Sequence, residues 1–221
     1  FGPGNRYVTK AKEIVSRKVA IDMPAGPSEV LVMADECAVP AFVASDLLSQ
    51  AEHGRDSQAI VVCSSRAIAE AVEAEVERQR GLLARAEYVA ESLAHSRAIV
   101  FDREEDMIAF AEEYAAEHLI VSMKDAWNVV DRITTAGSVF VGNYSPESAG
   151  DYASGTNHTL PTSGWAHSCS GVNIDSFMRK MTIQELSQEG IATLAPTIVA
   201  MADAEGLEAH ANAVKIRIAK C

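Results

Sequence analysis

The chain has 221 residues, of which 48% are hydrophobic and 23% are charged, so it can bury a sizeable apolar core. Its 31 acidic residues outnumber the 19 basic ones and give a formal net charge of −12. This excess argues against nucleic acid or an anionic membrane as a partner, because phosphate binding needs clustered Lys and Arg. The longest mostly apolar stretch, Ile191 to Ala202, is too short to span a bilayer. The first ten residues lack the apolar core of a signal peptide, so the expected location is the cytoplasm.

The cysteines are widely scattered along the chain, at Cys37, Cys63, Cys169 and Cys221. None of them belongs to a Cys-x-x-Cys pair, which disfavours both a cysteine zinc cluster and a disulfide framework. We expect reduced thiols, one or two of them in the core.

Short apolar segments alternate with helical patterns over the first two thirds of the chain. The segments with the composition of buried parallel strands are residues 29–33, 59–63, 98–101, 119–122 and 138–141. Helical patterns lie between them, at residues 40–54, 65–79, 85–93, 104–116 and 125–134. This alternation predicts βα units on a mostly parallel sheet.

The composition changes after the fifth predicted strand. Residues 142–164 are rich in Gly, Ser, Pro, Asn and Thr and have no helical or strand period, so we expect a long functional loop. Further on, Thr182 and Glu185 have the spacing of a capping box, and Pro196 is expected to separate or kink two helices. The last helical pattern has one apolar face, formed by Leu207, Ala211, Val214 and Ile218.

Two polar pairs have spacings that suit chemistry. Gln50 and His53 are three residues apart near a helix end, so an amide oxygen and an imidazole could meet one metal ion. The alternative is that His53 only interacts with the helix C-terminus. Glu117 and His118 precede a strand, where a carboxylate beside an imidazole could share proton transfers near neutral pH. The alternative here is a surface pair at the end of a helix.

Two more candidate groups lie in the C-terminal third. Asp151 and His158 occur in the Gly-rich loop, where the backbone could approach a ligand closely, although a lone Asp there often forms an Asx turn. Glu205 and His210 lie on different faces of one helix unless Gly206 interrupts it, and the alternative is a polar helix surface. The phosphate-loop, zinc-protease and dinucleotide fingerprints do not occur in the sequence. The patterns alone therefore lead to an α/β protein with a candidate Gln/His/Asp/His metal site.

Separated segments, taken together and in order, resemble the histidinol dehydrogenases, the family that catalyses the last steps of histidine biosynthesis. The matching segments are FGPGN, DMPAGPSEV, FVASDLLSQAEHG, EHLI, AGSVF-G, SPESAGDYASGTNHTLPT and EGLEAHANAV. The resemblance is to the C-terminal half of the family chain. It implies an α/β fold, with an incomplete doubly wound, Rossmann-like parallel sheet and a C-terminal helical tail. It also implies three parts: the end of an NAD-side domain at residues 1–27, the Rossmann-like domain with the metal and catalytic residues at 28–172, and a dimer-exchanging tail at 173–221.

The resemblance also implies a set of site residues at matching positions. Zinc is expected to be held by Gln50, His53, Asp151 and, in an intertwined homodimer, His210 of the partner subunit. Nitrogen and oxygen donors of this kind suit zinc. Glu117 and His118 correspond to the proton-transfer pair. Positions that contact the substrate match Ser28 and Glu205, together with the zinc ligands and His118, and a position that contacts NAD matches Asn5.

The implied reaction is the oxidation of L-histidinol to L-histidine through the aldehyde, with NAD as the oxidant in both steps. His118 is expected to take the alcohol proton, Glu117 to activate water for attack on the aldehyde, and zinc to orient the substrate. One alternative is a related zinc- and NAD-dependent dehydrogenase of another small polar alcohol. Another is a non-catalytic, zinc-binding dimerisation module. The sequence departs from the family pattern at Ala116, where a Pro usually precedes the Glu–His pair.

Overall fold

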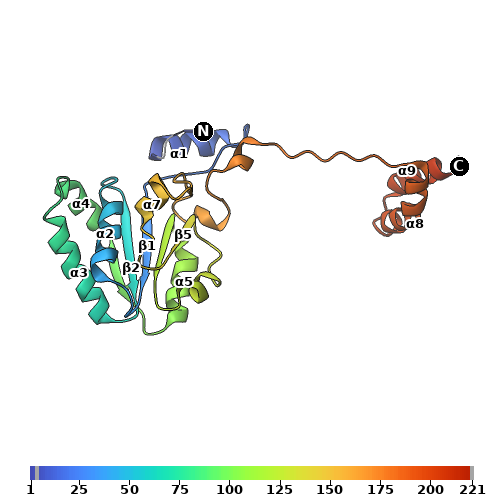
Figure 1. Cartoon of the computed structure of the whole chain (residues 1–221). Coiled ribbons are helices and arrows are strands. Elements are labelled where there is room, and N and C mark those ends of the chain that lie inside the picture. The colour runs from blue at the N-terminus through green and yellow to red at the C-terminus, as the bar shows by residue number, and fades with distance from the viewer. Residues whose placement is uncertain (3–4, 220–221) are drawn as a thin grey trace. The chain divides into compact units, whose positions relative to one another are not determined.

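The computed structural model describes residues 1–2 and 5–219, which form two compact units (Figure 1). The first unit runs from Phe1 to Phe177 and the second begins at Met178. Each unit is described by itself. Within the described residues, no helix is long and apolar enough to cross a membrane.

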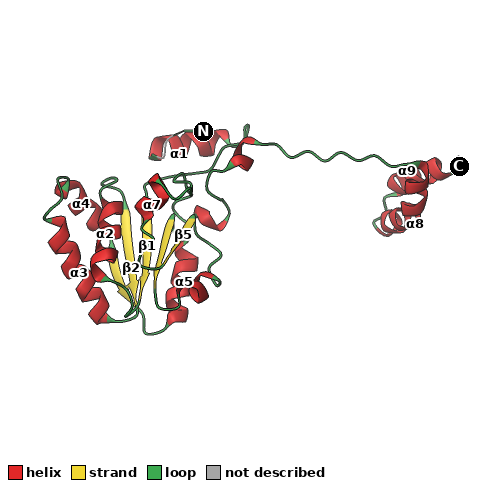
Figure 2. Ribbon diagram, in the orientation of Figure 1, coloured by secondary structure: helices red, strands yellow, loops and turns green. Residues whose placement is uncertain are grey.

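A five-stranded sheet forms the centre of the first unit, and every pair of neighbouring strands in it is parallel (Figure 2). The strands are β1 (Glu29–Ala34), β2 (Gln58–Cys63), β3 (Arg97–Val100), β4 (His118–Ser122) and β5 (Ser138–Val141). Their spatial order is β3-β2-β1-β4-β5, so the chain winds outward in both directions from β1. This is a doubly wound sheet with its switch point between β1 and β4, and the predicted fold class is confirmed.

Helices follow the strands as the alternating pattern predicted, with boundaries within a few residues of those expected. The helices of the first unit are α1 (Arg6–Val15), α2 (Pro40–Ala51), α3 (Arg66–Arg80), α4 (Ala86–Leu93), α5 (Glu104–Tyr114), α6 (Ala126–Val130) and α7 (Glu147–Tyr152). Short 3₁₀ turns follow at Trp165–His167 and Ile174–Phe177. The sequence patterns did not predict α1.

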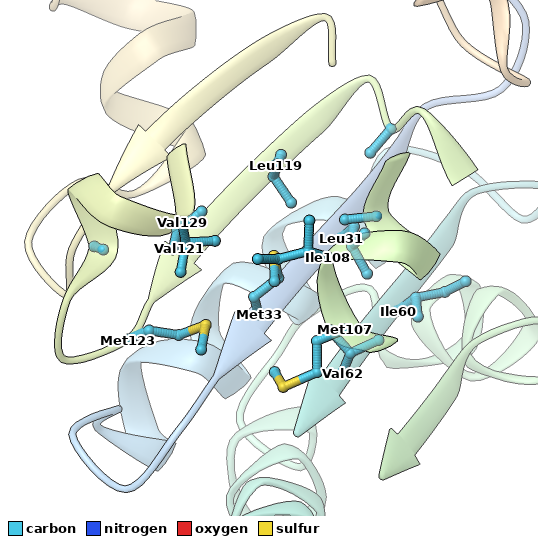
Figure 3. Packing of buried hydrophobic residues seen from close by; sticks show 13 residues of the cluster. Leu31, Met33, Ile60, Val62, Met107, Ile108, Leu119, Val121, Met123 and Val129 are labelled. Atoms are coloured by element: carbon cyan, nitrogen blue, oxygen red, sulfur yellow. The ribbon is translucent and has the colours of Figure 1, made fainter. Parts of the chain in front are cut away.

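Helices cover both faces of the sheet, which explains why the strands are continuous apolar runs. On one face, strand side chains pack against α5 and α6 (Figure 3). The central members of this cluster are Leu31, Met33, Val62, Met107, Ile108, Leu119, Val121 and Val129. On the other face, strand side chains pack against α2 and α3, in a cluster that includes Val30, Val32, Val43, Leu47, Val61, Val72 and Ile120.

The thiols fit the expectation from their spacing. Cys37, Cys63 and Cys169 are free cysteines, and Cys63 is buried in the sheet. Cys221 lies outside the described residues.

The geometry of α2 decides where the site forms. Pro40 occupies the first turn of this helix, where a missing N–H costs nothing. Because β1 and β2 are parallel, α2 must return the chain to the edge where both strands begin. Its last turn, with Gln50, therefore lies at the amino edge of the sheet. His118 begins β4 at that same edge and shares a face with Ile120, the face that α2 covers.

The expectation of a long loop over residues 142–164 was wrong for residues 147–152, which are helical. Residues 147–152 form α7, a helix of one and a half turns. Tertiary contact stabilises it, since a Cβ at Gly150 would lie 2.6 Å from the Phe140 ring. A glycine at this position lets the helix pack directly on β5, and no periodicity in so short a segment could reveal it.

The second unit consists of α8 (Gln188–Ala204) packed against α9 (Glu208–Ile218). The predicted capping box at Thr182 was wrong: α8 begins after Ser187, whose hydroxyl accepts the N–H of Gly190 at 3.0 Å. Serine is a favoured residue at this position, and Ser187 lies one turn before the apolar run that begins at Ile191.

Pro196 does not separate two helices, as one form of the prediction had it, because this proline lies inside α8. The two helices separate at Gly206, which adopts a left-handed φ of +70° that glycine tolerates best. Ala211 and Val214 are buried on the predicted apolar face of α9, whereas Leu207 is 40% exposed.

Replacing Gly150 by Ala should lower the free energy of unfolding by about 1–3 kcal/mol, because the added methyl group overpacks the contact with Phe140. Urea denaturation of the variant and the parent measures this difference. Gly81→Ala is the matched control. Gly81 has φ −63°, and the atom nearest to the new Cβ would be the backbone oxygen of Arg78, at 3.7 Å. Stability should therefore change by less than about 1 kcal/mol. An unchanged unfolding free energy in Gly150→Ala would contradict this packing.

Candidate metal and proton-transfer site

The candidate residues meet at the amino edge of the sheet, where β1 and β4 begin beside each other. Glu29 and His118 are the first residues of these strands, and Val30 pairs with His118 in the register. Doubly wound folds usually bind ligands at the opposite, carboxyl edge. The site of this chain therefore uses the end of α2 and the short helix α7, rather than the loops that follow the strands.

Glu117 is buried directly before β4. Its Oε2 accepts the backbone N–H of Glu29 at 2.9 Å. Burial raises the pKa of Glu117 to about 9, and the nearby carboxylates of Glu29, Glu147 and Asp151 add to the rise, against the opposing effect of the N–H bond. Without a bound cation, Glu117 is therefore an uncharged acid at pH 7.

The main chain of Glu117 leaves no room for a side chain at Gly137, the residue directly before β5. Ser138 donates its N–H to the Glu117 carbonyl at 2.9 Å, and a Cβ at Gly137 would lie 2.5 Å from the same oxygen. Glycine at 137 therefore permits the close approach that fixes the main chain of Glu117.

His118 is the second buried group, and its two ring nitrogens have different surroundings. Nδ1 lies 3.2 Å from the carbonyl oxygen of Glu29, which can only accept, so Nδ1 carries the proton. Nε2 is buried and has no hydrogen-bond partner among the described residues, and the nearest carboxylate oxygen, Oδ1 of Asp151, lies 3.9 Å away. Burial lowers the pKa of His118 to about 4. The ring is therefore neutral at pH 7, with a free lone pair on Nε2 that can accept a proton.

A group of metal-ligand type lies beside His118. One ligand atom each from His53, Glu147 and Asp151 lies within 4.8 Å of the others. His53 lies two residues beyond the end of α2, while Glu147 and Asp151 are one turn apart on α7 and so share a face. An imidazole with carboxylates is a donor set that suits zinc and other divalent metals.

The carboxyl groups of Glu147 and Asp151 lie close together, which disfavours the ionised form of Glu147. Burial, together with the charges of Asp151 and Asp46, raises the pKa of Glu147 to about 8. His53 Nε2 lies 3.7 Å from Oε1 of Glu147, too far for a good hydrogen bond. A divalent cation would offset the crowding of carboxylates, so the residues present fit a metal ion.

Gln50 reaches the same group from the last turn of α2. It is completely buried, and we assign its amide with the nitrogen toward Glu147, where it donates to both carboxylate oxygens at 3.2 and 3.1 Å. The reverse orientation would set the amide oxygen against the carboxylate and leave both amide ends unsatisfied. The fold thus brings together Gln50, His53 and Asp151, three of the residues proposed as zinc ligands from the sequence.

Sequence reasoning missed Glu147. Its spacing from Asp151, four residues, places two side chains on one helical face, but this signal has meaning only if the segment is helical. Because the segment was taken as a loop, the spacing could not be used.

The remaining predicted residues of the first unit, Ser28, Asn5 and His158, make local backbone contacts. Ser28 is half-buried before β1, and its carbonyl accepts the N–H of Gln58 at 3.1 Å. Asn5 caps α1, with its Oδ1 accepting the N–H groups of Tyr7 and Val8. His158 is exposed, and its Nδ1 lies 3.4 Å from the backbone oxygen of Asp151.

Glu205 and His210 belong to the second unit. Gly206 interrupts the helix between them, so Glu205 ends α8 and His210 lies in the first turns of α9. Both residues are exposed. Their part in the site stays a prediction.

The fold and the site together define a Rossmann-like α/β protein with a candidate divalent-metal site and a buried, neutral histidine. The family model for histidinol dehydrogenase matches residues 1–218, and the chain belongs to the histidinol dehydrogenase family, a family of oxidoreductases of histidine biosynthesis.

Known histidinol dehydrogenases align with nearly the whole chain. The chain is 57% identical over 219 residues to a histidinol dehydrogenase of Bacteroides fragilis (strain YCH46) and 54% identical over 221 residues to one of Escherichia coli O6:H1. Each alignment covers 99% of this chain and 51% of the relative, so the chain spans about half the length of the curated relatives it matches. The crystal structure of histidinol dehydrogenase from Elizabethkingia anophelis matches with a TM-score of 0.93 and 54% identity, over 100% of this chain and 51% of that one.

The raised pKa of Glu117 predicts that this residue destabilises the metal-free fold at neutral pH. Unfolding lets the carboxyl ionise at its ordinary pKa of 4.5, whereas the folded chain keeps it protonated until about pH 9. The unfolded state is thus favoured increasingly as pH rises from 4.5. Glu117→Gln removes this cost, so its advantage in unfolding free energy should grow between pH 5 and pH 7 by up to about 1.4 kcal/mol per pH unit.

Urea denaturation in the presence of a chelator, at pH 5 and pH 7, checks this prediction. Glu70→Gln is the control, because Glu70 is exposed on α3 and its charge should contribute within about 0.5 kcal/mol at either pH. A pH-independent difference between Glu117→Gln and the parent would show that Glu117 is ionised in the folded chain.

Proposed function

We propose that the chain carries the zinc and proton-transfer part of a histidinol dehydrogenase that oxidises L-histidinol to L-histidine through the aldehyde, with NAD as oxidant. The observation that carries the proposal is the buried, unpartnered Nε2 of His118 beside the His53/Glu147/Asp151 group. The names of the relatives, at 54–57% identity over 99% of the chain, support the choice of substrate. The cytoplasmic location expected from the sequence stays a prediction.

Gln50, His53 and Asp151 are the proposed zinc ligands of this chain, with His210 of the partner subunit as the fourth. The donor set of amide oxygen, imidazole nitrogen and carboxylate oxygen suits zinc. When bound, zinc supplies a template that holds the amine and imidazole of the substrate. Ser28 and Glu205 are proposed to contact the substrate, and Asn5 to contact NAD, which supplies the hydride acceptor.

His118 is proposed as the base of the first oxidation. Its Nε2 takes the proton of the alcohol as the hydride leaves the carbinol carbon. The Glu29 carbonyl holds the Nδ1–H at 3.2 Å and so keeps the lone pair on the nitrogen that faces the site. The lowered pKa of His118 keeps the ring in the neutral form that this step needs.

Glu117 is proposed to act in the second oxidation, where its carboxylate activates water for attack on the aldehyde. This role needs the ionised form, whereas burial and neighbouring charges favour the acid. Two of those neighbours, Glu147 and Asp151, belong to the metal-ligand group. A cation held there would offset their charges and thereby lower the pKa of Glu117 toward the form that accepts a proton.

A homodimer with exchanged tails is proposed as the complete site, because a fourth ligand is assigned to the second unit. The first residues of the second unit lie outside regular secondary structure and carry exposed apolar side chains, among them Met178, Met181 and Ile183. Apolar groups of this size are normally covered in a stable protein, and a partner subunit would cover them.

Replacing His118 by Asn should stop the first oxidation while leaving the metal in place. The Asn amide can still donate to the Glu29 carbonyl but has no counterpart of Nε2, so kcat should fall by about 10²–10⁴-fold. Steady-state oxidation of histidinol by the zinc-loaded full-length protein, with zinc content measured in parallel, checks this. His167→Asn, on an exposed 3₁₀ turn, is the control and should keep full activity.

The parent protein is assayed with histidinol and with other small amino alcohols. Turnover of another alcohol without turnover of histidinol would support a related dehydrogenase instead. Zinc binding with no turnover of any alcohol would support a non-catalytic dimerisation module.

Replacing His53 by Ala should abolish stoichiometric zinc binding, because the site loses one of its two proposed imidazole ligands. Equilibrium dialysis followed by metal analysis measures the loss, and circular dichroism checks that α2 persists. The control His95→Ala removes an exposed histidine outside this group. Retention of one zinc per subunit in His53→Ala would refute the assignment of His53 as a ligand.

A further inference from the structure

Glu147 has no role in the reaction proposed above, although it lies at the centre of the site. Its side chain is 1% exposed, and its carboxylate lies between Gln50 and His53. Burying a carboxylate is costly unless hydrogen bonds or a cation compensate it. A residue with this cost and no catalytic task needs an explanation.

The contacts of Glu147 point to one neighbour. Both of its carboxylate oxygens accept hydrogen bonds from the same group, the amide nitrogen of Gln50, at 3.2 and 3.1 Å. Its separation from His53 Nε2, 3.7 Å, is longer than a good hydrogen bond. The closest contact of the Glu147 carboxylate is therefore with the Gln50 amide, whose orientation it can fix.

An amide has two chemically different ends, and only one of them can bind a cation. The oxygen carries lone pairs, whereas the NH₂ group is a donor. A metal ion in the site would favour the ionised form of Glu147, and an ionised carboxylate only accepts hydrogen bonds. In that form Glu147 attracts the NH₂ end of Gln50 and turns the oxygen away from itself. Nothing in the shape of a glutamine side chain would otherwise distinguish the two orientations, which differ by a rotation of its terminal torsion.

We propose that Glu147 is a positioning residue that fixes the Gln50 amide with its oxygen free to bind the metal. This inference rests on the proposed function, because it assumes that Gln50 is a ligand. In metal sites, partners of this kind typically contribute about ten- to a hundred-fold in metal affinity.

Two other roles of Glu147 make different predictions. As a direct ligand, or as a source of negative charge, it would act on the cation itself. Its removal would then weaken binding whether or not Gln50 is present. As a positioning residue it acts through Gln50, and its removal should have little effect once Gln50 is gone. A double-mutant cycle separates the two cases.

The experiment measures the zinc affinity of the full-length protein by competition with a chelator, without any assay of turnover. Its variants are Glu147→Gln, Gln50→Ala and the combination of the two. We expect Glu147→Gln to weaken zinc binding by about ten- to a hundred-fold in the parent. In the Gln50→Ala background the same substitution should change the affinity by less than about twofold.

Asp46→Asn is the charge control. Asp46 lies one turn before Gln50 on α2, and its charge acts on Glu147. If charge alone explains the effect, Asp46→Asn and Glu147→Gln should weaken zinc binding similarly, and this result would overturn the proposal. An equal effect of Glu147→Gln in both backgrounds, or an affinity within about twofold of the parent, would overturn it as well.

A further variant keeps the proposal testable if Gln50→Ala fails to fold. Glu147→Asp retains the charge but withdraws the carboxylate by one methylene. Positioning predicts weaker zinc binding in this variant, and parent-like affinity would overturn the proposal. A parent that binds no zinc would overturn the metal site and this inference together, whereas zinc binding without oxidation of histidinol would overturn only the proposed reaction.

Discussion

The main chain of Glu29 holds both reactive side chains of the site. Its N–H donates to the Glu117 carboxyl, and its carbonyl accepts from Nδ1 of His118. Both bonds depend on the register that pairs Val30 with His118. A slip of one residue would turn His118 to the opposite face of the sheet, away from α2. Strand pairing in the core therefore determines which nitrogen of the imidazole is free.

The sequence predicted the parts of this arrangement that have a local signature. Alternating apolar runs and helical patterns predicted the parallel sheet, because strands covered on both faces must be apolar throughout. The spacing of Gln50 and His53 predicted that they lie close together, since α2 is long and regular. Glu147 could not be found in the same way. Its helix is short and depends on the contact of Gly150 with Phe140, which no local pattern records.

The wrong predictions for the C-terminal part also come from local patterns that do not record long-range contacts. The capping box at Thr182 and the break at Pro196 are local signals that longer-range packing overrides. Ser187 caps α8 instead, and Pro196 lies inside this helix, which packs against α9. The assignment of His210 and Asn5 rests on resemblance rather than on geometry, because the ligand that would define each contact comes from another chain or from a cofactor.

The direction of α2 has a consequence for the kind of ligand each edge of the sheet can attract. Helices between parallel strands run against them, so their C-terminal ends, with a partial negative charge, gather at the amino edge. Their N-terminal ends, which attract phosphates, gather at the other edge. The helix C-termini alone therefore make the amino edge electrostatically suited to cations, and the acidic side chains there strengthen this effect. The polarity of the peptide backbone, repeated over several helices, divides the domain into an edge for metal ions and an edge for anions.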